Sequence, residues 1–193
     1  TAKGFLSNTN IQHKAIFEDT VFFKQYVQEL DRLSKKDYLK SFFETIDNSY
    51  IKNKNILCSE FIIQDYSTSF VYEKSKIIRE ILNPKEGIQA YYNGVSEGEI
   101  SLSIASIQSL PVEIIELVAE NKVLYKFSNK IIQPRNSFDT INYNKVYAPF
   151  DSVSFNINKP SFVLRYKILG LSKIYNLKVY NWPYRKENFV END

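Results

Sequence analysis

The chain has 193 residues, of which 44% are hydrophobic and 15% aromatic, and its formal net charge is +3. The apolar content is too high for a disordered chain, and the length allows one large domain or two small ones. Lys and Arg exceed Asp and Glu by only 12 to 11 in residues 1–83 and by 13 to 11 in residues 84–193. Because binding to nucleic acid or to a membrane surface needs concentrated positive charge, neither kind of partner is expected.

The sequence contains no methionine. Without a start residue, the chain is expected to be a fragment or a processed product, with any signal peptide or anchor outside it. No apolar run approaches the ~20 residues that a membrane span requires, so no span is predicted within these residues.

Residues 5–83 lack both glycine and proline, whereas all six prolines and four of the five glycines come later in the chain. The change falls at Asn83-Pro84, where proline disfavours a helical conformation of the residue before it. This break divides the chain into a helical region, residues 1–83, and a second module, residues 84–193. The connection of about five residues favours a fixed docking angle over a flexible tether.

About four amphipathic helices are predicted before the break. The first begins after Asp19, which serves as its N-cap. The second begins at a capping box formed by Ser34 and Asp37. The third lies around residues 50–61 and the fourth at about 70–82. The apolar stripe of the first helix consists of Phe22, Tyr26, Leu30 and Leu33, with Phe23 and Val27 beside it.

About seven short strands are predicted after the break, because apolar and polar residues alternate there. Such alternation is typical of antiparallel strands with one face on a core and the other toward water. The count suggests an α+β protein whose second part is an immunoglobulin-like antiparallel β-sandwich. The strand segments are 88–92, 100–105, 112–118, 122–127, 153–157, 162–168 and 175–179.

The segment 112–118 fits a strand only if its alternation shifts near Ile114 and Ile115, as at a β-bulge. Pro111 could instead open a short helix. The neighbouring strands favour a strand here. Glu113 and Glu116 would lie on opposite faces of a regular strand, and a bulge would change that.

No catalytic constellation is evident. His13 is the only histidine, which excludes a His-based metal cluster, and its position in a polar leader predicts a structural or incidental role. Cys58 has apolar helical neighbours, which predicts a buried, inert thiol. Glu97 and Glu99 flank Gly98 in a predicted turn. No glycine-rich phosphate loop occurs. This chain alone is therefore predicted to contain no catalytic residue, cofactor site or metal site.

The richest aromatic cluster is YNLKVYNWPYRK, residues 175–186. On an extended chain, Tyr180, Trp182 and Tyr184 project to one side. These rings could stack on sugars or bases as a ligand platform. Alternatively they pack on a sheet edge or on the helical region, which is favoured because aromatic residues more often pack than bind.

Residues 18–30, EDTVFFKQYVQEL, resemble the Asp-x-x-Phe-x-x-x-Tyr-x-x-x-Leu helix that comes after the catalytic core in spore-coat protein H-like (CotH-like) kinases. The segments YLKSFFETID and IIREILNPKEGIQAYY are similar to the region between that helix and an appended β-domain in larger members. The resemblance covers roughly residues 11–92. The pattern is carried by Asp19, Phe22, Tyr26 and Leu30.

The resemblance implies a secreted or envelope-associated protein with an atypical protein-kinase fold that uses ATP and a divalent metal. The nucleotide-binding lysine and the metal-binding acidic residues would lie upstream of Thr1, and no position of this chain matches those motifs.

These observations favour a non-catalytic interaction or structural module from the C-terminal region of a surface or envelope protein. Its partner would be another protein or an upstream domain of the same protein, and its location extracellular or in the cell envelope. Two alternatives stay open: an accessory fragment of a CotH-like kinase, and a carbohydrate-binding module that uses the aromatic residues 180–184.

Overall fold

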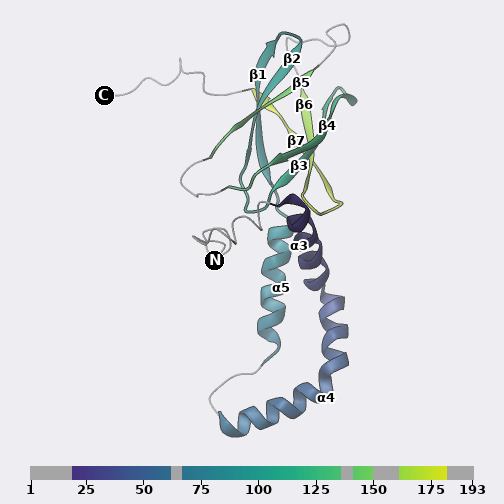
Figure 1. The fold of residues 1–193 in the computed structure, drawn as a ribbon, viewed down its shortest axis with the longest axis vertical. Helices are drawn as coiled ribbons and strands as arrows, with labels where there is room; N and C mark the ends of the chain where they lie inside the picture. The colour runs from purple at the N-terminus through teal and green to yellow at the C-terminus, as the bar shows by residue number, and fades with distance from the viewer. Residues whose placement is uncertain (1–18, 62–66, 136–140, 150–160, 182–193) are drawn as a thin grey trace, which may run out of the picture.

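A computed structural model describes residues 19–61, 67–135, 141–149 and 161–181. Within these residues, three helices precede eight strands, so the protein is α+β with the two kinds of element segregated along the chain (Figure 1). The helices are α3 (Thr20–Leu33), α4 (Lys36–Glu60) and α5 (Ser69–Leu82). The strands are β1 (Ile88–Ser96), β2 (Glu99–Ser106), β3 (Val112–Ala119), β4 (Lys122–Ile132), β5 (Asn144–Pro149), β6 (Phe162–Ile168), β7 (Ile174–Lys178) and β8 (Tyr180–Asn181).

The strands form two four-stranded sheets that pack together like a sandwich. The first sheet has the order β5-β2-β1-β8 and the second the order β4-β3-β6-β7. The expectation of purely antiparallel pairing is wrong at β8, which runs parallel to β1. The physical reason is that the chain leaves the second sheet after β7 and joins the first through Val179, whose N–H donates to the carbonyl of Phe162 at 2.9 Å.

The other predicted strands within the described residues are present. The segment 153–157 lies outside the described residues. The prediction missed β5, which has only two inward side chains, Val146 and Ala148, and therefore a weak alternation. The Glu97–Gly98 turn joins β1 to β2, and both residues have positive φ, as a two-residue hairpin turn of type I′ requires.

The segment 112–118 is a strand, and the predicted β-bulge is confirmed. The pairing of β3 with both neighbours shifts between Ile114 and Glu116. The extra residue places Glu113 and Glu116 on one face, where they pair with Lys167 at 3.1 Å and Arg165 at 2.6 Å. Each carboxylate thus has a cationic partner on the neighbouring strand β6.

Asp19 caps α3 as predicted, since its carboxylate accepts hydrogen bonds from the N–H groups of Val21 and Phe22. The buried face of α3 is turned by about one residue from the predicted stripe. Phe23 and Val27 are buried, whereas Phe22 is exposed.

The predicted capping box at Ser34 and Asp37 is wrong. Ser34 is the C-cap of α3, and its hydroxyl donates to the carbonyl of Asp31. The N-cap of α4 is Lys35, whose side chain makes no capping hydrogen bond. Ser34 is instead buried, where its carbonyl accepts a hydrogen bond from the Ser75 hydroxyl at 2.6 Å.

The predicted second and third helices are one helix, α4, so the described residues hold three helices in place of four. No glycine or proline interrupts its 25 residues. Figure 1 shows that α4 bends partway along its length. The Thr45 hydroxyl donates to the carbonyl of Ser41 at 2.9 Å, a local bond that often bends helices.

The three helices extend from one end of the sandwich as an arm, with α3 and α5 nearest the sheets (Figure 1). A second hydrophobic core joins the two parts. Phe23 and Val27 of α3 and Leu82 of α5 pack with Leu110, Ile168 and Leu169 of the strand module. The junction of arm and sandwich is therefore a packed contact.

Candidate functional site

Two clefts lie on the helical arm, α3 to α5, between its helices. The proximal cleft has a volume of about 600 Å³, and the distal cleft of about 410 Å³ shares Tyr72 with it. The proximal cleft is lined by Ser34, Lys36, Tyr72, Ser75, Lys76, Arg79, Glu80 and Asn83. The distal cleft is lined by Lys40, Phe43, Glu44, Asp47 and Tyr72.

Helix α5 forms much of the wall of the proximal cleft. Tyr72, Lys76, Arg79 and Asn83 recur at intervals of four, three and four residues, which places them on one face of the helix. The adjacent face carries Ser75, Ile78 and Leu82, which are buried or half-buried toward α3 and the sandwich. Sequence reasoning missed the cleft because it followed only apolar residues, although the same periodicity in polar residues marks it.

The cationic groups of the proximal cleft are incompletely paired. Arg79 Nη1 is buried, lies 3.8 Å from Asp31 Oδ1, and has no hydrogen-bond partner among the described residues. The other oxygen of Asp31 lies 3.1 Å from Lys35 Nζ. Asp31 therefore shares its charge between two cations, and the guanidinium keeps donor capacity.

Aromatic rings continue from the clefts along α4. Phe43 contacts Tyr72 across the distal cleft, with ring centroids 5.8 Å apart, and also contacts Phe42 and Tyr50. Tyr38 stacks on Phe42, and the guanidinium of Arg32 lies 4.8 Å from the Tyr38 ring centroid. The clefts thus border an aromatic surface.

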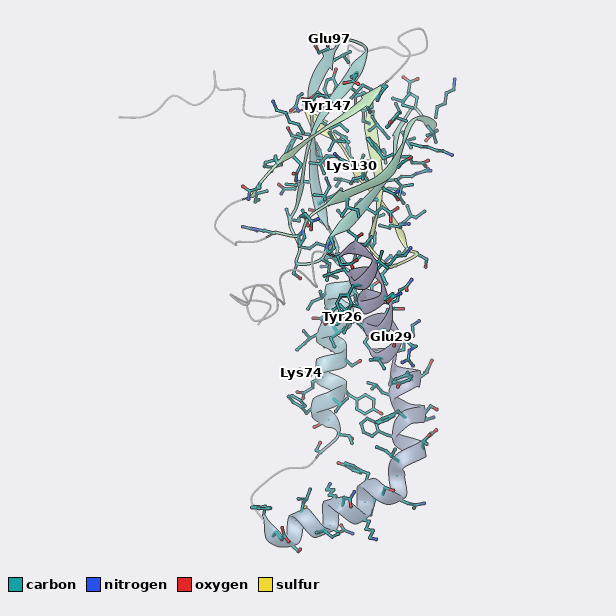
Figure 2. The ribbon with its side chains drawn as sticks, viewed as in Figure 1. Tyr26, Glu29, Lys74, Glu97, Lys130 and Tyr147 are labelled. Atoms are coloured by element: carbon teal, nitrogen blue, oxygen red, sulfur yellow. The ribbon has the colours of Figure 1, made fainter. Side chains whose placement is uncertain are left out.

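Large apolar side chains are exposed on other faces of α4 and α5. On α5, Phe70, Lys74, Ile77 and Ile81 recur at intervals of four, three and four residues and form an exposed stripe. Figure 2 places Lys74 on the side of α5 turned away from α4, and its ammonium lies 5.1 Å from the Phe70 ring centroid. The exposed apolar residues of α4 are Phe42, Ile51, Ile56 and Leu57.

Of the three aromatic residues singled out from the sequence, only Tyr180 lies within the described residues; Trp182 and Tyr184 lie outside them. Tyr180 is 56% exposed, and the ammonium of Lys178 lies 5.6 Å from its ring centroid. The packing of Trp182 and Tyr184 remains a prediction.

Tyr180 belongs to a tyrosine-rich outer face of the first sheet. It is in register with Tyr91, whose ring contacts that of Tyr143 at 5.7 Å. Tyr147 of β5 is exposed on the same face (Figure 2). Burial, and then the neighbouring Tyr91, raise the pKa of Tyr143 above its ordinary value.

Hydrogen-bonding groups lie among these tyrosines. The amide nitrogen of Asn93 donates to the Ser103 hydroxyl at 2.9 Å and lies 3.3 Å from that of Ser101. The hydroxyl of Tyr143 donates to the Gln89 side chain at 2.7 Å.

The remaining candidates do not come together. Figure 2 shows Glu97 at the end of the sandwich opposite the arm. Cys58 is a free thiol on α4 and is half-buried, less enclosed than predicted. His13 lies outside the described residues. Within the described part of the chain, no group of three or more His, Cys, Asp or Glu side chains could hold a metal ion.

Neither a known protein family, nor a curated protein, nor a solved structure matches this chain. In the described part of the chain, no helix is long and apolar enough to cross a membrane.

Proposed function

We propose that this chain is a non-catalytic interaction module of a surface or envelope protein. The helical arm contacts a protein surface, which belongs to a partner or to an upstream domain of the same protein. The sandwich-like part, which we assign to the immunoglobulin-like architectures on its two packed four-stranded sheets, serves as the rigid base of the arm.

The observation that carries this proposal is the exposed apolar surface of α4 and α5. Helix α4 buries only Leu39 among its 25 residues, although it carries several large apolar side chains. Soluble monomeric proteins rarely leave extended apolar patches uncovered, and larger patches usually mark interaction sites. A second protein surface laid against the exposed faces of α4 and α5 would cover these side chains.

Site-specific photo-crosslinking tests the proposal. A benzophenone amino acid replaces Ile77 on the exposed stripe of α5 in the chain expressed in its source cells. We expect a discrete adduct with one protein, or an internal adduct with another domain of the same protein, identified by mass spectrometry. The matched control replaces Val123, an exposed apolar residue of β4.

The proposal fails if Ile77 and Val123 give the same background of adducts, because the arm would then be no more engaged than the sandwich. A benzophenone side chain at an exposed site should not disturb packing. A variant that misfolds nevertheless would be recognised by a circular dichroism spectrum that differs from that of the wild type.

The CotH-like resemblance suggests which protein the arm belongs to. In this version the arm docks on a kinase domain upstream of Thr1 and contributes no catalytic residue itself. A longer protein that includes the upstream residues would bind ATP with magnesium, whereas the present chain would not. Micromolar, saturable ATP binding by the present chain in calorimetry would contradict this version.

Carbohydrate binding is the second candidate, and the tyrosine-rich outer face of the first sheet favours it. Aromatic rings stack on sugar faces, and the Asn93, Ser101 and Ser103 side chains between them supply hydrogen-bonding groups. A glycan array with wild type, Tyr147→Ala and Tyr180→Ala tests it. Glycan binding that each of the two changes abolishes would support carbohydrate binding. If no glycan on the array binds, carbohydrate binding is rejected and only the first candidate remains.

A further inference from the structure

The proximal cleft has an excess of positive charge. Among its charged lining residues, Lys36, Lys76 and Arg79 are cationic and only Glu80 is acidic. Lys36 and Lys76 form no ion pair with any described residue. Cations gathered in a concave site attract an anion more strongly than the same charges on a convex surface, because the low-dielectric walls focus the field.

Arg79 adds a specific donor to this charge. Its Nη1 is shielded from solvent, and its ion partner Asp31 is 3.8 Å away, too far for a hydrogen bond. A buried donor without a partner is costly, and hydrogen bonds from guanidinium to carboxylate are among the stronger ones in proteins. The Arg79 side chain as a whole is 42% exposed, so an incoming carboxylate can approach its guanidinium.

The charge of the distal cleft has the opposite sign to that of the proximal cleft. Glu44 and Asp47 line it together with a single cation, Lys40. Between the basic and the acidic ends lie the rings of Tyr72 and Phe43, which are in contact. The two clefts together thus have a positively charged proximal end, an aromatic wall in the middle and a negatively charged distal end.

We infer that the two clefts together bind an extended segment of a protein partner that carries carboxylates at one end, a basic residue at the other and an apolar residue between them. The carboxylates pair with Lys76 and Arg79, the apolar side chain contacts Tyr72 and Phe43, and the basic residue faces Glu44 and Asp47. This inference rests on the proposed function and adds the chemistry of the partner.

The size of the site fits a short extended segment. Residues 36 to 47 of α4 rise about 16 Å along a helix. An extended chain covers that distance with about five residues. A six-residue peptide is therefore long enough to test the inference without the rest of a partner.

The experiment measures fluorescence anisotropy of two labelled peptides against the full chain. The first has the sequence Glu-Glu-Phe-Gly-Lys-Lys, and the second replaces both glutamates by glutamine. We expect the first peptide to bind at least about tenfold more tightly, since charge-assisted hydrogen bonds are about twice as strong as neutral ones. Raising the salt concentration should weaken the binding of both peptides, and that of the glutamate peptide more, because it makes more charge pairs.

Two variants locate the preference. The first variant is Lys76→Gln, at an exposed residue, and the second combines Lys76→Gln with Arg79→Gln. Each should weaken the binding of the glutamate peptide and leave the affinity for the glutamine peptide unchanged. That pattern is the coupling expected of direct charge pairs. The control Lys52→Gln removes one exposed lysine of α4 outside both clefts and should leave both affinities unchanged.

Three results would overturn the inference. The two peptides bind equally, or Lys76→Gln weakens both peptides to the same extent, or inorganic phosphate displaces the peptide at the concentration at which unlabelled peptide does. The last result would assign the cleft to a small anion. Photo-crosslinking from Ile77 is independent of these outcomes, so failure here is distinguishable from failure of the proposed function.

Discussion

The sandwich buries its apolar side chains, whereas the distal helical arm leaves most of its large apolar side chains exposed or half-buried. In β6, every second residue is buried along the strand, and the corresponding side chains of β2 and β3 complete one continuous core. In α4, a helix of 25 residues, only Leu39 is buried. The sandwich therefore completes its own core, whereas the distal arm needs another surface to cover it. This difference is the physical basis of the interaction proposal.

The largest expected difference between the two regions is that between two matched leucine truncations, one in each region. Leu164→Ala on β6 removes a fully buried side chain and should lower the free energy of unfolding by about 2–5 kcal/mol. Leu57→Ala, the same change at a 38% exposed site of α4, should cost less than about 0.5 kcal/mol. Denaturant melts measure both, and equal losses would show that the arm has a core of its own.

Gly170 tests whether arm and sandwich are held together at their junction. Its φ is +98°, and an added Cβ would lie 2.7 Å from the carbonyl oxygen of Lys24 on α3. Gly170→Ala should therefore destabilise the protein by about 1–3 kcal/mol beyond the matched change Gly98→Ala. Gly98 also has positive φ, but no atom lies near its Cβ position. Similar thermal midpoints for the two variants would mean that α3 does not constrain the β6–β7 turn.

The hydroxyl of Tyr166 makes a hydrogen bond where the chain enters β1, next to the arm. Its hydroxyl accepts a hydrogen bond from the buried N–H of Gly87 at 3.0 Å. Tyr166→Phe leaves that donor without a partner and should cost about 1–3 kcal/mol. The control is Tyr175→Phe, because the buried Tyr175 hydroxyl has no partner among the described residues. That change should be neutral or stabilising, and a larger loss than for Tyr166→Phe would refute this assignment.

The same residue predicts a pH dependence. Burial raises the pKa of Tyr166 above its ordinary value of about 10, although the Gly87 hydrogen bond opposes the shift. A raised pKa in the folded state means that the unfolded state loses its proton first. The contribution of Tyr166 to stability is therefore complete below pH 10 and is lost as the pH rises through the higher folded pKa. Urea melts between pH 8 and pH 11 should show a smaller alkaline loss for Tyr166→Phe than for wild type.

The smallest effect is expected on the exposed stripe of α5. Phe70 is 62% exposed, so Phe70→Gln should change the free energy of unfolding by less than about 0.5 kcal/mol. It should nevertheless reduce photo-crosslinking from Ile77, since both residues lie on the proposed interaction surface. A large loss of stability would mean that Phe70 packs within the chain.

The fold was predictable where a local pattern decides the structure. Asp19 as N-cap, the end of α5 at Asn83-Pro84, and the bulge at Ile114 all result from short-range rules. The errors arose where tertiary packing overrides such rules. Ser34 looks like the start of a capping box, but it is buried against Ser75, 41 residues away in the sequence.

The candidate site was much less predictable. Its proximal cleft joins the end of α3, the start of α4 and one face of α5, and no short motif connects these segments. The periodic polar face of α5 was visible in the sequence, but only the arrangement of three helices turns that face into a cleft. The parallel pairing of β8 had no local signal either, since it depends on the crossing at Val179.

Hydrogen exchange of the isolated chain tests the central contrast most directly. Amides of β2, β3 and β6 should exchange only through global unfolding, whereas amides of α4 should exchange through local opening at a clearly lower free energy. That result would identify a self-sufficient sandwich that carries an arm in need of a partner. Protection of α4 equal to that of β3 and β6 would contradict the account, because it would show that the arm is stable without any second surface.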